Sequence, residues 1–113
     1  MPYYLVQLSY TAESWRALTA NPQDRQDAVT PLVERLGGRF VSAKFLCFGE
    51  YDLMAIVEMP DNINAAAFSM TISAGGAVKA FRTTPLIPMV DGIAAMRRAG
   101  TVKAQYRGPG AQP

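Results

Sequence analysis

The chain has 113 residues, the usual size of one domain with a single hydrophobic core. Hydrophobic residues make up 50% of it and charged residues only 18%, against roughly 25% in an average soluble chain. This excess of apolar surface favours a buried interface between subunits. No apolar run reaches the roughly 18 residues that a membrane span needs, and the start lacks a signal-peptide pattern. We therefore expect a cytoplasmic protein with no membrane partner.

Missing residue types exclude several kinds of site. The sequence contains no histidine, and Cys47 is its only cysteine. Without histidine there is no Ser-His-Asp triad, and the commonest acid–base group and metal ligand is absent. A single cysteine excludes an internal disulfide and a cysteine-cluster metal site. We therefore predict no cofactor and no bound metal.

The net charge of +2 is unevenly distributed. From Gly92 onward the chain carries no acid, and its basic residues there are Arg97, Arg98, Lys103 and Arg107. So few charges, with one aromatic residue among them, make a poor nucleic-acid surface, and we do not expect nucleic acid as a partner. We divide the chain into a domain over residues 1–99 and a basic C-terminal tail over residues 100–113.

The first half predicts a strand followed by helical structure. Residues 3–10 alternate with period two, which predicts a strand. Thr11 is a good N-cap, and Asn21-Pro22 allows a restart, so residues 12–36 are predicted to be helical up to the stop at Gly37-Gly38. Pro31 within this stretch predicts a kink or a second restart capped by Thr30.

The second half predicts three strands and two helices. Residues 39–48 and 51–59 are predicted strands around a tight turn, in which Gly49 would take a positive φ. Asp61 or Asn62 caps the next helix, and Gly75-Gly76 ends it. Residues 77–84 form the last predicted strand, cut off by Pro85 and Pro88. A short helix over about residues 89–99 and the tail follow.

The order β-α-β-β-α-β predicts an α+β, ferredoxin-like fold: a four-stranded antiparallel sheet with helices on one face. Both sides of the predicted strands are largely apolar. Strand 51–59, for example, places Leu53 and Val57 on one side and Met54 and Ile56 on the other. In a sheet with one solvent-exposed face, apolar and polar residues would alternate more regularly along each strand. We therefore predict a homo-oligomer, at least a dimer, in which the sheets of two copies meet.

The stretch over residues 48–61, around Gly49-Glu50-Tyr51-Asp52, resembles the signature of the GYD domain family. Residues 1–11 and the helix with its glycine stop at residues 25–38 are similar to the same family, so the resemblance covers about residues 1–84. It implies a ferredoxin-like fold of the dimeric α+β-barrel group. The family has no settled activity, so no catalytic residue follows from it. Pro31, the stretch 85–88 and the C-terminal extension depart from its pattern.

Polar residues inside strand patterns are the candidate ligand-binding residues, because converging polar groups in an apolar cavity are typical of ligand sites. The candidates are Gln7, Lys44, Tyr51, Asp52, Arg82 and Thr84. Salt bridges or interface hydrogen bonds explain the same residues equally well. For Asp52 we favour a structural role, as an acceptor for backbone groups or for Lys44 or Arg82. Trp15 is interpreted as a packing residue.

Three classes of function stay open. The leading one is a homo-oligomeric small-molecule-binding or accessory module, whose partners are itself and a small organic ligand. The alternatives are a cofactor-free enzyme of the oxygenase or isomerase/tautomerase type and a purely structural assembly subunit. For a tautomerase, Pro2 would supply the amine after removal of Met1. An enclosed pocket with converging polar groups favours the first two classes, and a filled interior favours the third.

Overall fold

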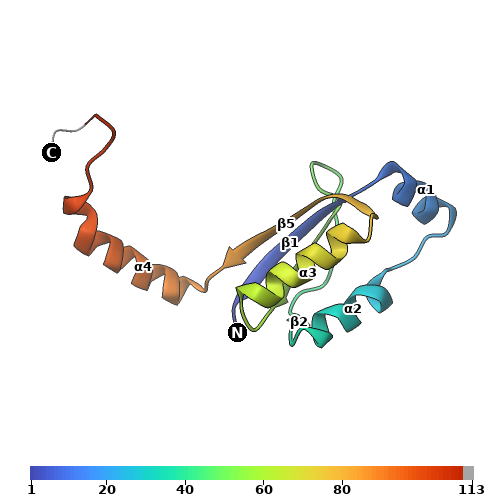
Figure 1. The fold of residues 1–113 in the computed structure, drawn as a ribbon, viewed down its shortest axis with the longest axis horizontal. Coiled ribbons are helices and arrows are strands. Elements are labelled where there is room, and N and C mark those ends of the chain that lie inside the picture. Colours follow the sequence, from blue (N-terminus) through green and yellow to red (C-terminus); the bar gives the residue numbers. More distant parts are fainter. Residues whose placement is uncertain (111–113) are drawn as a thin grey trace.

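The computed structural model describes residues 1–110 (Figure 1). Its elements, in chain order, are β1 (Tyr3–Tyr10), α1 (Ala12–Ala20), α2 (Gln26–Arg35), β2 (Arg39–Phe40), β3 (Phe45–Leu46), β4 (Leu53–Glu58), α3 (Asn62–Ala74), β5 (Val78–Leu86), α4 (Met89–Val102) and a 3-10 turn at Lys103–Gln105. The prediction of an α+β chain with an antiparallel sheet is confirmed. None of the helices in this range is long and apolar enough to cross a membrane.

The sheet is built around β1. It runs in the order β2-β4-β1-β5, and β3 pairs with the same edge of β4 as β2 does. All the pairings are antiparallel. The register sets Val6 of β1 opposite Ala55 of β4 and Thr83 of β5, so these three side chains share a face of the sheet.

That face carries the hydrophobic core. Helices α2 and α3 lie over it (Figure 1), and the buried cluster is formed by Tyr4, Val6, Val33, Ala55, Val57, Met59, Ala65 and Phe68. Gly38, just before β2, allows this close packing. A Cβ atom there would lie 2.3 Å from the Glu58 carbonyl oxygen and 2.5 Å from the Met59 sulfur, so only glycine fits without a shift.

The opposite face is less covered. It presents Leu5, Gln7, Met54, Ile56, Arg82 and Thr84, as the register requires. None of these residues is fully buried, whereas Tyr4, Val6, Ala55 and Val57 on the helical face all are. Leucine, methionine and isoleucine on a half-open sheet face form an apolar surface that lacks a covering layer within one chain.

Helix α4 projects away from the sheet, beyond the end of β5 (Figure 1). The molecule is 61 Å long, and its radius of gyration is 18.4 Å, against about 13 Å for a compact 100-residue domain. No residue of α4 is buried, and its exposed side chains include Met89, Val90, Ile93 and Met96. The helix predicted near residues 89–99 therefore exists and continues to Val102. The basic tail stays a prediction, and residues 111–113 of it lie outside the described residues.

The predicted strand over residues 39–48 is wrong in its middle, which is why the sheet has five strands instead of four. Only Arg39–Phe40 and Phe45–Leu46 are strands. The Ile56 backbone N–H donates to the Ser42 hydroxyl at 2.8 Å, a side-chain bond that takes the place of a ladder bond. Gly49 was also misjudged, since the positive-φ glycines of residues 1–110 are Gly37, Gly76 and Gly110.

Three predictions that rested on proline also need correction. The second helix begins at Gln26, so Asn21-Pro22 does not restart it. Pro31 lies inside α2, which continues past Thr30 without a new cap, so the restart at Thr30 is wrong and the kink stays a prediction. Strand β5 passes through Pro85 to Leu86. A proline is tolerated there because β5 is an edge strand, where a missing N–H need not break the ladder.

Candidate functional site

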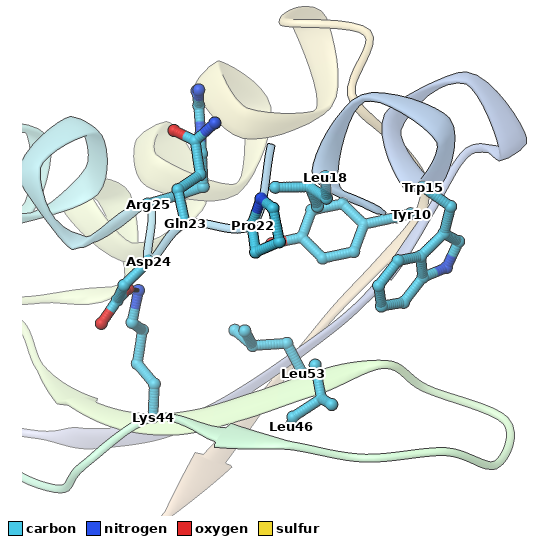
Figure 2. A pocket seen from close by; sticks show the side chains of 10 residues that line it. All are labelled: Tyr10, Trp15, Leu18, Pro22, Gln23, Asp24, Arg25, Lys44, Leu46 and Leu53. Atoms are coloured by element: carbon cyan, nitrogen blue, oxygen red, sulfur yellow. Dashed lines mark hydrogen bonds and ion pairs between the residues drawn. The ribbon is translucent and has the colours of Figure 1, made fainter. Parts of the chain in front are cut away.

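A cavity of about 340 Å³ lies between the α1–α2 connection and the strands β3 and β4. The residues that line it are Tyr10, Trp15, Leu18, Pro22, Gln23, Asp24, Arg25, Lys44, Leu46 and Leu53. Figure 2 shows Tyr10, Leu18 and Pro22 on one side and Leu46 and Leu53 facing them, with Lys44 and Trp15 at opposite ends. The cavity is thus an apolar slot with a cation at one end and an indole at the other.

A smaller hollow of about 40 Å³ continues the slot toward the core. It shares Tyr10, Arg25, Lys44 and Leu53 with the larger cavity. Its other lining residues are all apolar: Val6, Leu8, Val29, Phe40, Ala55, Phe68, Ile72 and Phe81. Arg25 and Lys44 therefore lie where the slot meets the hollow, and the rest of the hollow is lined by the hydrophobic core.

The indole end of the slot is held by Asp52. Its Oδ2 accepts hydrogen bonds from the Tyr10 backbone N–H at 2.9 Å and from the Trp15 Nε1–H at 3.2 Å. The Tyr10 and Trp15 rings meet edge to face, with centroids 5.3 Å apart and planes at 78°. Thr11 starts α1 directly after β1 by accepting the Ser14 N–H, so Trp15 is fixed relative to the sheet.

The cationic end of the slot is an ion pair between Lys44 and Asp24. The Lys44 side chain is 13% exposed, whereas that of Asp24, in the α1–α2 connection, is 69% exposed. The hydrogen bond from Lys44 holds the pKa of Asp24 below its ordinary value. A largely covered lysine side chain is therefore paired at its ammonium with a carboxylate that remains in contact with solvent.

The phenol of Tyr10 lies in the wall of the slot. Burial raises its pKa above the ordinary value of 10.0, the Arg25 charge opposes this, and the negative charges of Asp24 and Asp52 add to it. The hydroxyl therefore keeps its proton at neutral pH. It can donate a hydrogen bond to a ligand but is not placed to act as a base.

The structure brings only part of the candidate set to this cavity. Lys44 lines it, and Asp52 stands behind its wall. The Asp52 carboxylate accepts the Tyr10 backbone N–H, which is one of the two expected kinds of partner, and the Trp15 Nε1–H instead of Lys44 or Arg82. Gln7 faces Arg82 across β1 and β5, and Thr84 faces Leu5, on the opposite face of the sheet. Tyr51 lies in the β3–β4 loop and does not line the cavity.

Sequence reasoning missed most of the lining residues. Trp15 does pack on Tyr10, as the sequence indicates, but it also lines the cavity, and residues 22–25 form a connection where the sequence predicts a helix restart. The signal that was present is local: Trp15 and Leu18 repeat at helical spacing directly after a strand that ends in Tyr10, so all three lie at one end of the sheet.

Metal ligands are not gathered at this site. Within residues 1–110 no group of three or more His, Cys, Asp or Glu side chains is placed to hold a metal ion. The cavity instead offers Lys44, Arg25, Gln23 and the Tyr10 hydroxyl, which are hydrogen-bond donors, and the single carboxylate of Asp24. This donor set suits an anionic or hydrogen-bond-accepting organic group.

The family model of the GYD domain matches residues 4–96, which include every residue of the cavity. The chain belongs to the GYD domain family. The match extends past residue 84, through β5 and into α4. A relative of this GYD protein is the glutamine synthetase and cystathionine beta-lyase binding protein of Thermus thermophilus. It is 31% identical over 97 residues, which cover 86% of this chain and all of that protein. No solved structure matches the chain significantly.

Proposed function

We propose that this GYD protein is a homo-oligomeric accessory module that binds a small organic molecule in the slot between Lys44 and Trp15. The observation that carries the proposal is the cavity itself, which combines apolar walls with the Lys44 ammonium at one end within one chain (Figure 2). Its volume of about 340 Å³ falls within the range of roughly 300–1,000 Å³ typical of small-molecule sites.

The proposed assembly is the face-to-face pairing of two ferredoxin-like sheets as a dimeric α+β barrel. The strand order β2-β4-β1-β5 and the placement of α2 and α3 over one face support it. The apolar residues of the other face, Leu5, Met54 and Ile56, are not fully buried in one chain. A second copy would cover them, and the same sheet would then be buried on both sides.

A binding role is favoured over catalysis by the titratable groups of the cavity. Lys44 and Asp24 neutralise each other, and the lowered pKa of Asp24 makes its carboxylate a weak base. The raised pKa of Tyr10 keeps its phenol protonated. A general base needs a pKa near the working pH, and none of these shifts produces one.

A second candidate function is binding to a metabolic enzyme, which the name of the Thermus relative favours. The test is to mix the purified protein with purified glutamine synthetase or cystathionine beta-lyase from its own host and to follow the mixture by sedimentation velocity. A faster boundary that contains both proteins would support this function, and independent boundaries at micromolar concentration would contradict it.

Native mass spectrometry of the protein purified from its own host tests the main proposal. The expected spectrum shows a dimer or a larger homo-oligomer that carries additional small-molecule mass. The variant Lys44→Met should lose this mass. The matched control Lys79→Met, which changes an exposed lysine of β5 that does not line the cavity, should keep it. A stable monomer without bound mass would refute the proposal.

A further inference from the structure

Lys44 is the charged group that the cavity buries most deeply. Both the hydrogen bond and the ion pair of its ammonium go to one oxygen of Asp24. An ammonium has three donors, so its remaining donors are available at the end of the slot. Asp24 belongs to the exposed connection between α1 and α2 and reaches Lys44 from the solvent side. Asp24 can therefore separate from Lys44 by moving directly into solvent.

The rest of the slot favours an uncharged, apolar body. Tyr10, Leu18 and Leu53 supply walls on two sides, and Trp15 closes the far end with its indole (Figure 2). The Trp15 N–H is already bonded to Asp52, so the ring offers an apolar surface and no free donor. A ligand that fits both ends therefore has a polar group at Lys44 and an aliphatic or aromatic part toward Trp15.

We propose that the slot binds a small organic carboxylate with an apolar or aromatic body, and that its carboxylate takes the place of Asp24 on the Lys44 ammonium. This inference rests on the proposed small-molecule function and names the ligand class. The exchange leaves Lys44 paired both before and after binding, so this largely covered side chain gains a new partner as it loses the old one. Asp24 moves into solvent, to which it is already 69% exposed.

Other ligand charges fit less well. A cation would meet the Lys44 ammonium at the polar end of the slot. A phosphate is favoured by a guanidinium fork or by several cations, and Figure 2 shows the Arg25 side chain directed away from Lys44. A neutral compound would have to share Lys44 with Asp24 in a confined space. A single carboxylate matches the one cation at that end of the slot, Lys44 (Figure 2).

Trp15 makes the test direct, because it is the only tryptophan of the chain and it lines the slot. The full-length protein is titrated at neutral pH and low salt with 3-phenylpropionate and, as a matched neutral probe, with 3-phenylpropionamide, while Trp15 fluorescence is recorded. The carboxylate should cause a saturable change at a concentration at least about tenfold lower than the amide, because its bond to Lys44 is charge-assisted on both sides.

Three variants assign the effect to the ion pair. Lys44→Met should weaken binding of the carboxylate about ten- to a hundredfold and leave the amide nearly unchanged. Asp24→Asn should tighten binding of the carboxylate, because the internal competitor is weakened. Lys79→Met, which removes the same charge from an exposed position of β5 that does not line the cavity, should change neither titration. Thermal melting of each variant verifies that it is folded.

The outcomes separate the ligand class from the proposed function. Equal affinities for acid and amide, or a loss in Lys44→Met that both probes share, would overturn the carboxylate assignment while small-molecule binding stands. Weaker binding in Asp24→Asn would overturn the exchange and make Asp24 a ligand contact. If neither probe changes Trp15 fluorescence, the inference is wrong, and bound mass in native spectra then decides separately whether the protein binds small molecules.

Discussion

Asp52 joins the end of β1, the start of α1 and the β3–β4 loop. Its carboxylate accepts the Tyr10 and Trp15 donors, its N–H donates to the Leu8 carbonyl at 2.8 Å, and its carbonyl accepts the Cys47 N–H at 2.7 Å. A residue that bonds through its side chain and both backbone groups fixes the local geometry. The structural role favoured from the sequence therefore has concrete partners: a backbone N–H, as expected, and the Trp15 indole in place of Lys44 or Arg82.

Replacing Asp52 by Asn should lower the free energy of unfolding by about 1–3 kcal/mol, the usual scale for weakening a charged hydrogen bond. The measurement is urea unfolding followed by Trp15 fluorescence. Glu50→Gln removes the same charge from the same loop, and we expect it to stay within about 0.5 kcal/mol of the parent, as exposed substitutions usually do. Unchanged stability together with lost ligand retention would instead assign Asp52 to binding.

Gly38 and Gly49 offer a matched test of packing. A Cβ atom at Gly38 would collide with the Glu58 carbonyl, whereas one at Gly49 would meet nothing within 4 Å. Neither residue has a positive φ, so the same change to alanine isolates the steric term. Gly38→Ala should cost about 1–3 kcal/mol or more of unfolding free energy, and Gly49→Ala should be nearly neutral. Equal effects in chemical denaturation would show that the β2–β4 contact can relax.

At the scale of elements, the sequence predicted those parts whose signals are local. The alternation of β1, the Thr11 and Asp61 caps, and the glycines after α2 and α3 each act within a few residues, and each is found in the structure. The prediction of one strand over residues 39–48 was wrong because the Ser42 side chain accepts the Ile56 N–H, and this contact joins residues that are distant in the sequence. No local pattern distinguishes that hydroxyl from one that faces solvent.

The cavity was only partly predictable for the same physical reason. Lys44 was a candidate because it is polar within a strand pattern, yet it reaches the slot from the irregular stretch between β2 and β3. Its partner Asp24 and the opposite end at Trp15 come from other segments, and tertiary packing alone brings them together. Gln7 and Arg82 are also polar residues within strand patterns, but they lie on the sheet face opposite the helices and do not line the cavity.

The stability of α2 can be tested at Pro31. It lies in the helix interior and removes the N–H that would bond to the Asp27 carbonyl. Pro31→Ala should therefore raise the free energy of unfolding by about 1–3 kcal/mol, which is the helix penalty of proline reduced by the entropy that it removes from the unfolded chain. Pro22→Ala, in the α1–α2 connection, should have the opposite sign, with a loss of about 0.4–1 kcal/mol. A destabilised Pro31→Ala protein would mean that the core requires the proline geometry.

At the scale of the whole molecule, two of the apolar surfaces that one chain leaves accessible bear on its assembly. One is the sheet face that carries Leu5, Met54 and Ile56, and the other is α4 with Met89, Ile93 and Met96. The extended shape follows from the second, because α4 leaves the end of β5 and points away from the sheet (Figure 1). Both surfaces are more apolar than a monomer in water favours, and both become less exposed if copies of the chain associate.

Pairing through the sheet face can be tested at Ile56 and Val57, which are neighbours on β4 and point to opposite sides of the sheet. Val57 is 1% exposed beneath the helices, so Val57→Glu should prevent folding. Ile56→Glu places the charge on the uncovered face, so the monomer should fold while the dimer would bury an unpaired charge. Such burial costs about 3–5 kcal/mol, and the dimer dissociation constant should rise at least about a hundredfold.

Sedimentation velocity at micromolar concentration measures the assembly of the Ile56→Glu variant, and far-UV circular dichroism reports whether it is folded. We expect a dimer or larger species for the parent and a folded monomer for the variant. A truncation after Pro88 separates the two apolar surfaces: if the shortened chain still dimerises and Ile56→Glu still dissociates it, the sheet face suffices. A parent that sediments as a monomer, or an Ile56→Glu variant that stays dimeric, would contradict pairing through this face.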